Sequence, residues 1–299
     1  MNAPSIDVRV RIIHGVLQRI ADDAGARLLH IKGPAVAEEL LDRRTTVDSS
    51  GEKVEVTVPR GSSDADILVH PADIKAFLAA VQQHGWVKKT SFNSGSAFGH
   101  ALNIYHPKLG NADVHRYYPG LPEDAFEDLW AHHGATELGS VECPVPSVHA
   151  QRLILLLHAA RSGPGHPDVD RAWTRASDDE RASVRALARE MGAELGLAAA
   201  LDELDGWEHH PEYLLWKHYR EANPSRLHEW HARWKAARGL RAKSRVARSF
   251  VFFDPASLES DLGRTPTFRE ILRRNLGRFG TMGRELAAYA TSRLKKGGG

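Results

Sequence analysis

Two aspartates in the stretch RGSSDADILV, residues 60–69, have a type and spacing that could support chemistry. Asp64 and Asp66 open a strongly apolar run that predicts a strand, although strand interiors normally avoid aspartate. Side chains two residues apart leave a strand on the same face, roughly 6.5 to 7 Å apart along it. We therefore expect both carboxylates on one face of a strand that is otherwise buried.

A third aspartate, Asp113, lies in another predicted strand, NADVHRYY, and His115 follows on its face. Carboxylates that converge on one sheet raise one another's pKa values unless a cation lies between them. Oxygen ligands of this kind suit Mg²⁺, with Mn²⁺ as the other candidate, and two such ions can assist a phosphoryl displacement. The alternative interpretation is an Asp-x-Asp pair in a turn or at a solvated edge. His115 could equally touch a ligand or simply pack on the sheet.

A glycine turn precedes this strand in the sequence. Residues 27–31 predict a short strand that runs into Lys32 and Gly33, and residues 34–41 then predict a helix with proline at its first position. Such a turn can hold a phosphate, because free backbone N–H groups point outward at a helix N-terminus. Many turns in α/β proteins share this pattern, so the turn alone is a weak signal.

The elements around these residues must position them, and to about residue 146 they alternate between helices and strands. The patterns predict a helix that ends at Gly25, a polar loop followed by a strand at 54–58, a helix that ends at Gly85, and strands within 85–92, 98–106 and 111–118. From Ser147 only helical periodicity remains, over residues 147–163, 178–204, 211–222, 226–253 and 267–280. The sequence therefore predicts an α+β protein with a small mixed sheet in residues 1–146 and a helical C-terminal domain in residues 147–299.

Composition places the chain among ordinary soluble globular proteins, with 42% hydrophobic and 26% charged residues in a length of 299. The single cysteine, Cys143, excludes an intramolecular disulfide and leaves no cysteine cluster for zinc. No signal-peptide pattern and no apolar run of membrane-spanning length is present. We therefore expect a cytoplasmic protein without a membrane span.

The net charge of +2 conceals an asymmetry along the chain. Residues 211–299 carry 19 lysines and arginines against 8 acidic residues, which leaves 21 against 30 for residues 1–210. Residues 231–248 hold seven of these basic residues and no acidic one, with Trp230 and Trp234 in or beside them. This basic tail could bind RNA through phosphate contacts and stacking. A solvated amphipathic helix or a helix on anionic lipid explains the same residues.

Taken in order, LLHIKGPAVAEELL, RGSSDADILV and NADVHRYY resemble the polymerase-β-like nucleotidyltransferase superfamily. More narrowly, they look like bacterial families described only as uncharacterised nucleotidyltransferases. The resemblance covers residues 27 to about 118. It implies Mg²⁺-dependent transfer of a nucleoside monophosphate from an NTP to a hydroxyl acceptor, with release of pyrophosphate. The acceptor could be an RNA end, a protein side chain or a small molecule.

The resemblance also implies roles for individual residues. It implies that three aspartates bind the metal: Asp64, Asp66 and Asp113. It also implies that a second set of residues binds the nucleotide: Lys32, Gly33, Arg60, Ser62, Ser63, His115, His158 and Asp170. The last two stand about where toxin-type relatives carry a basic residue and a later aspartate, although those relatives have a lysine where this chain has His158. A toxin–antitoxin role is thus a further candidate, with the protein partner unknown.

Two departures from the family pattern concern the pocket. Pro34 stands where many members have a second small residue, and 31 residues separate Gly33 from Asp64, which is long for the compact members. A catalytically inactive nucleotide- or RNA-binding module of the same fold is the alternative function. The presence of all three carboxylates favours the enzyme, because a degenerate copy would be expected to lose at least one.

Overall fold

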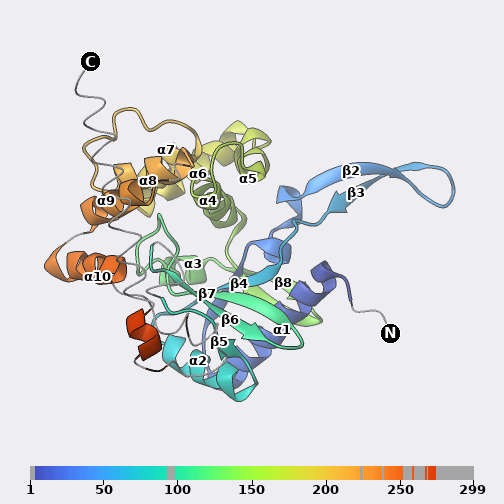
Figure 1. Ribbon diagram of the computed structural model, residues 1–299. Coiled ribbons are helices and arrows are strands. Elements are labelled where there is room, and N and C mark those ends of the chain that lie inside the picture. The colour runs from blue at the N-terminus through green and yellow to red at the C-terminus, as the bar shows by residue number, and fades with distance from the viewer. Residues whose placement is uncertain are drawn as a thin grey trace.

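The computed structural model describes residues 4–92, 98–222, 225–237, 239–251, 258, 267 and 269–273 of the chain. Its central element is a five-stranded mixed sheet in the order β1-β4-β7-β6-β5 (Figure 1). β4 and β7 run parallel, and the other neighbours pair antiparallel. The strands are β1 (Leu28–Ile31), β4 (Asp64–Val69), β5 (Val87–Lys88), β6 (Ala101–His106) and β7 (Gly110–His115).

Alternation along β4 sends its side chains to opposite faces of the sheet. Ala65 and Ile67 are fully buried in a core that they share with α1 (Ile6–Ala24) and α2 (Ile74–Gln83), which cover one face (Figure 1). The two aspartates of β4 therefore project from the other face, because successive side chains of a strand alternate. This confirms the sequence-based expectation of two aspartates on one face of a largely buried strand.

The face that carries the aspartates is covered by helices from later in the chain. α4 (Val148–Ala159) is almost entirely buried and packs against α6 (Asp178–Glu190) and α7 (Glu194–Ala200). Leu68 of β4 and Leu156 of α4 belong to the same apolar core. The division of the chain into two domains at residue 146 stays a prediction, although the structure itself is mixed α+β as expected.

Within the described residues after 147, every regular element is helical, as the periodicity predicts. The remaining helical elements of the structure are α3 (Phe126–Ala131), α5 (Pro167–Val169), the π-helical turn η3 (Asp170–Thr174), α8 (Tyr213–Arg220), α9 (Arg226–Ala236) and α10 (Gly239–Val251). Two predicted long helices are each divided in two. Gly192 follows α6 with a φ of 60°, and Gly239 begins α10 with a φ of 78°. Glycine in this left-handed conformation interrupts a helix at little steric cost.

The helix predicted over 267–280 is described only at 267 and 269–273, where residues 269–273 are helical. The other residues of that prediction lie outside the described part of the chain. Among the helices that are described, none combines the length and apolar character that a membrane crossing requires.

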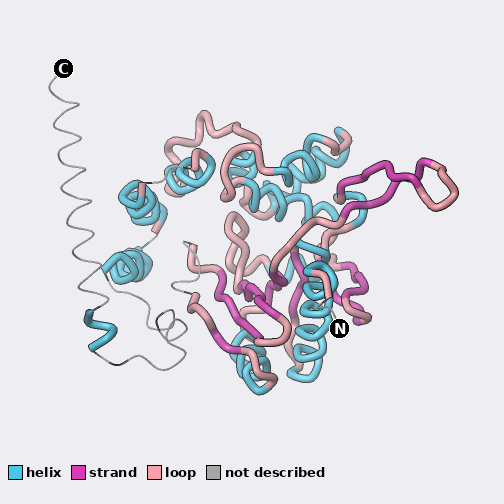
Figure 2. Tube along the Cα trace, turned by 45° about the vertical axis from the view of Figure 1, so that its right-hand side comes forward, coloured by secondary structure: helices cyan, strands magenta, loops and turns pink. Residues whose placement is uncertain are grey.

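Two hairpins were not predicted as such. β2 (Asp42–Val47) and β3 (Lys53–Val58) form a ribbon that projects away from the rest of the molecule, as Figures 1 and 2 both show. The prediction of a polar loop before residue 54 was thus wrong, because β2 pairs with β3 along its whole length. β8 (Gly134–Leu138) and β9 (Val141–Val145) form the second hairpin, which contacts α1.

The helix predicted over 34–41 is also absent. Two short 3₁₀ turns, η1 (Gly33–Ala35) and η2 (Glu38–Leu40), are separated by Val36 and Ala37, whose backbones are extended. The Ala37 N–H donates a 2.7 Å hydrogen bond to the Gln151 side chain of α4. A tertiary contact therefore satisfies a backbone group that the predicted helix would have used internally.

Candidate active site

The three aspartates singled out in the sequence lie together on adjacent parallel strands. Asp66 of β4 is the direct register partner of Asp113 of β7, and Asp64 pairs with Asn111. Asp66 is 5% exposed, whereas Asp64 and Asp113 are half-buried. Asp66, Asp113 and His115 each offer a ligand atom within 4.8 Å of the others. The arrangement is a carboxylate cluster at the sheet face that the later helices cover.

The negative charges of Asp66 and Asp113 repel the charge of Asp64. Burial raises the pKa of Asp64, and the negative charges of Asp66 and Asp113 raise it further. The Ser62 hydroxyl partly offsets this effect by donating to Asp64 Oδ1 at 3.1 Å. Repulsion of this kind is what a bound cation relieves.

Asp66 is already paired with two nitrogen groups. Its Oδ1 lies 2.6 Å from Lys32 Nζ and 2.9 Å from His115 Nε2. Burial alone would raise the pKa of Asp66, but the Lys32 ammonium and the His115 ring hold it well below its usual range. Burial acts to lower the pKa of Lys32, but the charge of Asp66, the neighbouring Tyr118 and the hydrogen bond to Asp66 together outweigh it, so that this pKa is raised. The two groups form a buried ion pair.

The donor set fits a divalent cation such as Mg²⁺. Asp66 and Asp113 supply carboxylate oxygens, which Mg²⁺ prefers, and His115 lies beside them. One oxygen of Asp113 accepts a 2.9 Å hydrogen bond from Asn103 Nδ2. His115 Nδ1 is buried and has no hydrogen-bond partner within the described residues, so the cluster retains an unsatisfied polar atom. The residues whose ligand atoms lie close enough together to hold the ion are Asp66, Asp113 and His115. Asp64 lies two residues before Asp66 on the same face of β4 and is the further candidate.

The glycine turn lies directly against the loop that leads into β4. Lys32 and Gly33 both adopt positive φ angles, 59° and 49°. A Cβ on Gly33 would lie 3.1 Å from Ser62 Cβ, so a side chain there would push the two segments apart. Positive φ in a non-glycine residue such as Lys32 costs energy and is often retained at functional sites. The turn thus brings Lys32 and Ser62 to the carboxylates, while Ser63 is exposed.

Arg60 and His158 meet a carboxylate that was not singled out in the sequence. Asp168 is fully buried and accepts two hydrogen bonds from Arg60, at 2.9 and 2.8 Å. His158 Nδ1 lies 3.1 Å from Asp168 Oδ2, and burial lowers the pKa of His158 to about 4. Arg171 also contacts Asp168, at 3.0 Å. With two guanidinium groups on it, Asp168 is an anchor for Arg60 and poorly suited to a metal ion.

Asp170, the candidate from the sequence, lies elsewhere. Its side chain is 58% exposed and forms an ion pair with Arg175 at 3.1 Å. Asp168 and Asp170 both follow His158 at about the distance in sequence that the family resemblance implies. In the structure Asp168 is buried and Asp170 is exposed. The sequence therefore predicts an aspartate in this segment, but it does not indicate which of the two is buried.

Three residues beside the cluster were missed altogether. Tyr118 is 1% exposed, and its hydroxyl has no partner within the described part of the chain. The Arg161 guanidinium lies over the Tyr118 ring at 5.1 Å. Burial holds the pKa of His100 far below its usual range, and its ring packs against that of His115, with centroids 5.1 Å apart and planes tilted by 40°. Tyr118 belongs to the NADVHRYY stretch, but no residue pattern distinguishes it from a core tyrosine.

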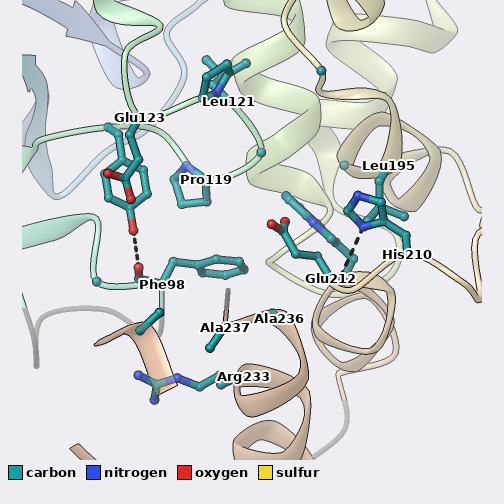
Figure 3. A pocket seen from close by; sticks show the side chains of 18 of the residues that line it. Phe98, Pro119, Leu121, Glu123, Leu195, His210, Glu212, Arg233, Ala236 and Ala237 are labelled. Carbon is teal, nitrogen blue, oxygen red and sulfur yellow. Dashed lines mark hydrogen bonds between the residues drawn. The ribbon is translucent and has the colours of Figure 1, made fainter. Parts of the chain in front are cut away.

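A cavity of about 630 Å³ lies where the segment after β7 meets α7, α8 and α9 (Figure 3). Phe98, Tyr117 and Trp216 contribute aromatic side chains to its wall. Glu123 and Glu212 line it as well, together with Arg116 and Arg233. Arg116, which lines the cavity, lies three residues after Asp113 in the sequence.

No protein-family model matches the sequence, and no curated protein matches it. One matching solved structure is a lincosamide antibiotic adenylyltransferase, LnuA, with lincomycin bound. The identity is 12% and the TM-score 0.31, over 57% of this chain and 92% of that chain. A likeness this weak does not assign the chain to a family.

Proposed function

We propose that this chain is a metal-dependent nucleotidyltransferase of the polymerase-β-like kind, which transfers a nucleoside monophosphate from an NTP to a hydroxyl acceptor. The observation that carries the proposal is the carboxylate cluster: Asp64 and Asp66 on β4 and Asp113 on the parallel neighbour β7. The glycine turn at Gly33 lies against the segment that leads into β4 and brings Lys32 to the same cluster.

In this proposal Asp64, Asp66 and Asp113 hold the divalent cation, which when bound neutralises phosphate charge and stabilises the attacking and leaving oxygens. The acceptor oxygen attacks the α-phosphorus and forms a new P–O bond. The bond from that phosphorus to the bridging oxygen breaks, and pyrophosphate leaves with the electron pair. Asp113, half-buried and steadied by Asn103, accepts the proton of the attacking hydroxyl.

Lys32 and Arg60 supply positive charge to the triphosphate. The Lys32 ammonium is held 2.6 Å from Asp66, so it stays at the cluster without being free to sample other positions. Arg60 is anchored by Asp168, and its side chain is 10% exposed. Fixed charges of this kind cost no reorganisation when charge develops on the leaving group.

A transfer assay tests the proposal and identifies the nucleotide. The protein is incubated with each α-labelled NTP and Mg²⁺, in the presence of total RNA, of the protein alone, or of a panel of small hydroxylated molecules. Label should move to one acceptor class in the wild type and not in the Asp64→Asn, Asp66→Asn double variant. The matched control is Asp128→Asn, an exposed aspartate of α3. Wild-type transfer by the double variant would show that the catalytic assignment is wrong.

A binding module without catalysis is the second candidate, and one observation favours it. Asp66 forms an ion pair with Lys32 and a hydrogen bond with His115, so this carboxylate has two partners within the protein itself. This candidate predicts that nucleotide binds equally well in EDTA and in Mg²⁺, and that no label is transferred. Equilibrium binding of a labelled NTP under both conditions separates the two functions.

RNA remains a candidate partner through the basic tail, and cytoplasmic location and an antitoxin-like partner remain predictions. The side chains of Arg241, Arg245 and Arg248 lie outside the described residues. The proposal of RNA contact therefore rests on the charge of residues 211–299, which carry 19 basic and 8 acidic residues.

A further inference from the structure

The ribbon of β2 and β3 projects from the body of the molecule as a separate two-stranded sheet (Figure 2). Its six residue pairs follow one another without a bulge. Within the described part of the chain, β2 is the one strand that pairs with β3, so the other edge of β3 carries backbone groups without a strand partner. Such an edge can pair with a strand of another chain, and two strands alone are only marginally stable in water.

The base of the ribbon is fastened to the body. Asp42, the first residue of β2, forms ion pairs with Arg171 and with Arg175, the second at 2.8 Å. On β3, the Thr57 hydroxyl donates a 3.2 Å hydrogen bond to Glu38. These contacts fix the direction in which the ribbon leaves the body. Pairing of the β3 edge with another strand therefore requires little further ordering of this chain.

The two strands of the ribbon differ in polarity. Val54, Val56 and Val58 alternate with polar residues along β3, so all three lie on one face of the ribbon. Every residue of β2 before Val47 is polar or charged. A strand that pairs with β3 in the matching register extends the valine face, whereas a slip of one residue would place its apolar side chains on the opposite face. The free edge of β3 therefore suits a strand with the same alternation, and a second copy of β3 has it.

Charge selects one register for two antiparallel copies of β3. Their valines share a face when a residue lies opposite itself in the other copy, as at Val54, Glu55 or Val56. Centring on Glu55 sets two glutamates opposite each other, which is unfavourable. Centring on Val56 sets Glu55 opposite Thr57. Centring on Val54 sets Lys53 of each copy opposite Glu55 of the other, which gives two pairs of opposite charge.

We infer that the β3 edge is an interface between two copies of this chain, which pair antiparallel about Val54 and join their ribbons into one sheet. Lys53 of each copy pairs with Glu55 of the other. The Glu55 carboxylate is open to this second cation, because its ion pair with Arg43 at 3.3 Å leaves its side chain 60% exposed. Pairing over about five residues buries much less than a standard interface of roughly 1,600 Å², so the dimer is of the weak, transient class. Its formation does not depend on nucleotidyl transfer.

Sedimentation equilibrium of the full chain, from about 10 µM to about 500 µM, tests for the dimer at the concentrations where a weak complex forms. The weight-average mass of wild type should rise from that of one chain towards that of two. A mass of one chain at every concentration would overturn the inference and leave the edge to a strand of another protein.

Charge reversal tests the register. Lys53→Glu and Glu55→Lys each set like charges opposite in a homodimer, so each variant alone should have a dissociation constant at least about tenfold higher than wild type. An equimolar mixture of the two should recover wild-type association, because every opposed pair then has opposite charges. This recovery also shows that both variants are folded. Glu137→Lys, on the exposed strand β8, is the matched control and should associate like wild type. Association of Lys53→Glu equal to that of wild type, or a mixture that stays dissociated, would contradict the inference.

Cross-linking locates the two-fold axis. In the inferred dimer the two copies of Val54 lie opposite each other, whereas the two copies of Val56 lie about 13 Å apart along the strands. Oxidation of Val54→Cys should therefore give a disulfide-linked dimer at least about tenfold faster than oxidation of Val56→Cys, which is the control. The native Cys143 is buried and leaves the introduced thiol as the reactive one. Equal rates, or a faster reaction of Val56→Cys, would overturn the inferred pairing.

Discussion

Replacing Asp64 with asparagine should stabilise the metal-free protein. Burial and the charges of Asp66 and Asp113 raise the pKa of Asp64, so its ionised form is disfavoured in the folded state. Two unit charges ~7 Å apart repel by about 2.4 kcal/mol at an effective dielectric constant of ~20. Because Lys32 lies 2.6 Å from Asp66, it cancels part of the field at Asp64. We therefore expect a gain of about 1 kcal/mol in the free energy of unfolding at pH 7.

The sign of the pH dependence follows from the same shift. A carboxyl with a raised folded-state pKa favours folding fully only below its unfolded pKa, and this contribution is lost as the pH rises through the folded pKa. Wild type should therefore lose stability relative to Asp64→Asn as the pH rises from about 3.5 towards 7. The two proteins should be nearly equal at the acidic end of that range.

Urea unfolding in EDTA at several pH values measures this difference, with Asp128→Asn as the control that should show no gain. Added Mg²⁺ should then stabilise wild type more than Asp64→Asn, because the variant has lost one ligand. The reasoning is refuted if Asp64→Asn is less stable than wild type in EDTA at pH 7. A gain that is the same at all pH values would also refute it, since neutralisation would not be its source.

The remaining predictions concern the ion pairs and the basic tail. Asp66→Asn should destabilise the protein by about 3 kcal/mol in urea unfolding, because it leaves the buried Lys32 ammonium without its partner. Asp168→Asn should lower the free energy of unfolding by about 2 to 4 kcal/mol, because it leaves the Arg60 guanidinium, whose side chain is only 10% exposed, without its partner. The same variant should raise the KM for NTP. Asp170→Asn on the surface should change the free energy of unfolding by less than about 0.5 kcal/mol. If RNA is bound, its affinity should fall steeply with salt, and filter binding should show a flatter salt slope when four basic residues become alanine: Arg241, Lys243, Arg245 and Arg248.

The strands that carry the carboxylates could be predicted because their pattern is local. Alternation in DADILV and NADVHRYY places the aspartates on one face, and the structure confirms β4 and β7 at these residues. That the two strands are neighbours could not be derived from periodicity, because pairing of distant strands depends on the whole sheet. The family resemblance implied it, and the register of Asp66 with Asp113 agrees.

Partners of the charged side chains could not be predicted. The sequence predicts that converging carboxylates raise one another's pKa values. In the structure this holds for Asp64, whereas Asp66 is paired with Lys32 and its pKa is lowered. The choice of Asp168 over Asp170 as the partner of Arg60 likewise depends on a contact between residues 108 positions apart. Short-range sequence patterns do not predict contacts between residues so far apart in the chain.

The prediction of a helix after Gly33 was wrong for a related reason. Proline at its first position and good helix formers after it favour a helix locally. The hydrogen bond from Ala37 to Gln151 of α4 holds the backbone extended instead. Intrinsic propensity is worth only a fraction of a kcal/mol per residue, so one tertiary hydrogen bond together with the packing around it can override it.

The central claim is that the carboxylate cluster transfers a nucleoside monophosphate, and Asp113→Asn tests it most directly. Asp113 is the one cluster carboxylate that comes from β7, and its substitution leaves the Lys32–Asp66 pair in place. Wild type, Asp113→Asn and Asp128→Asn are given NTP labelled at the α-phosphate or at the γ-phosphate, with Mg²⁺ or with EDTA. The account predicts that only the α label reaches acceptor, only with Mg²⁺, and at a rate at least about 100-fold lower in Asp113→Asn than in the other two proteins. Transfer of the γ label, or equal transfer by Asp113→Asn, would contradict it.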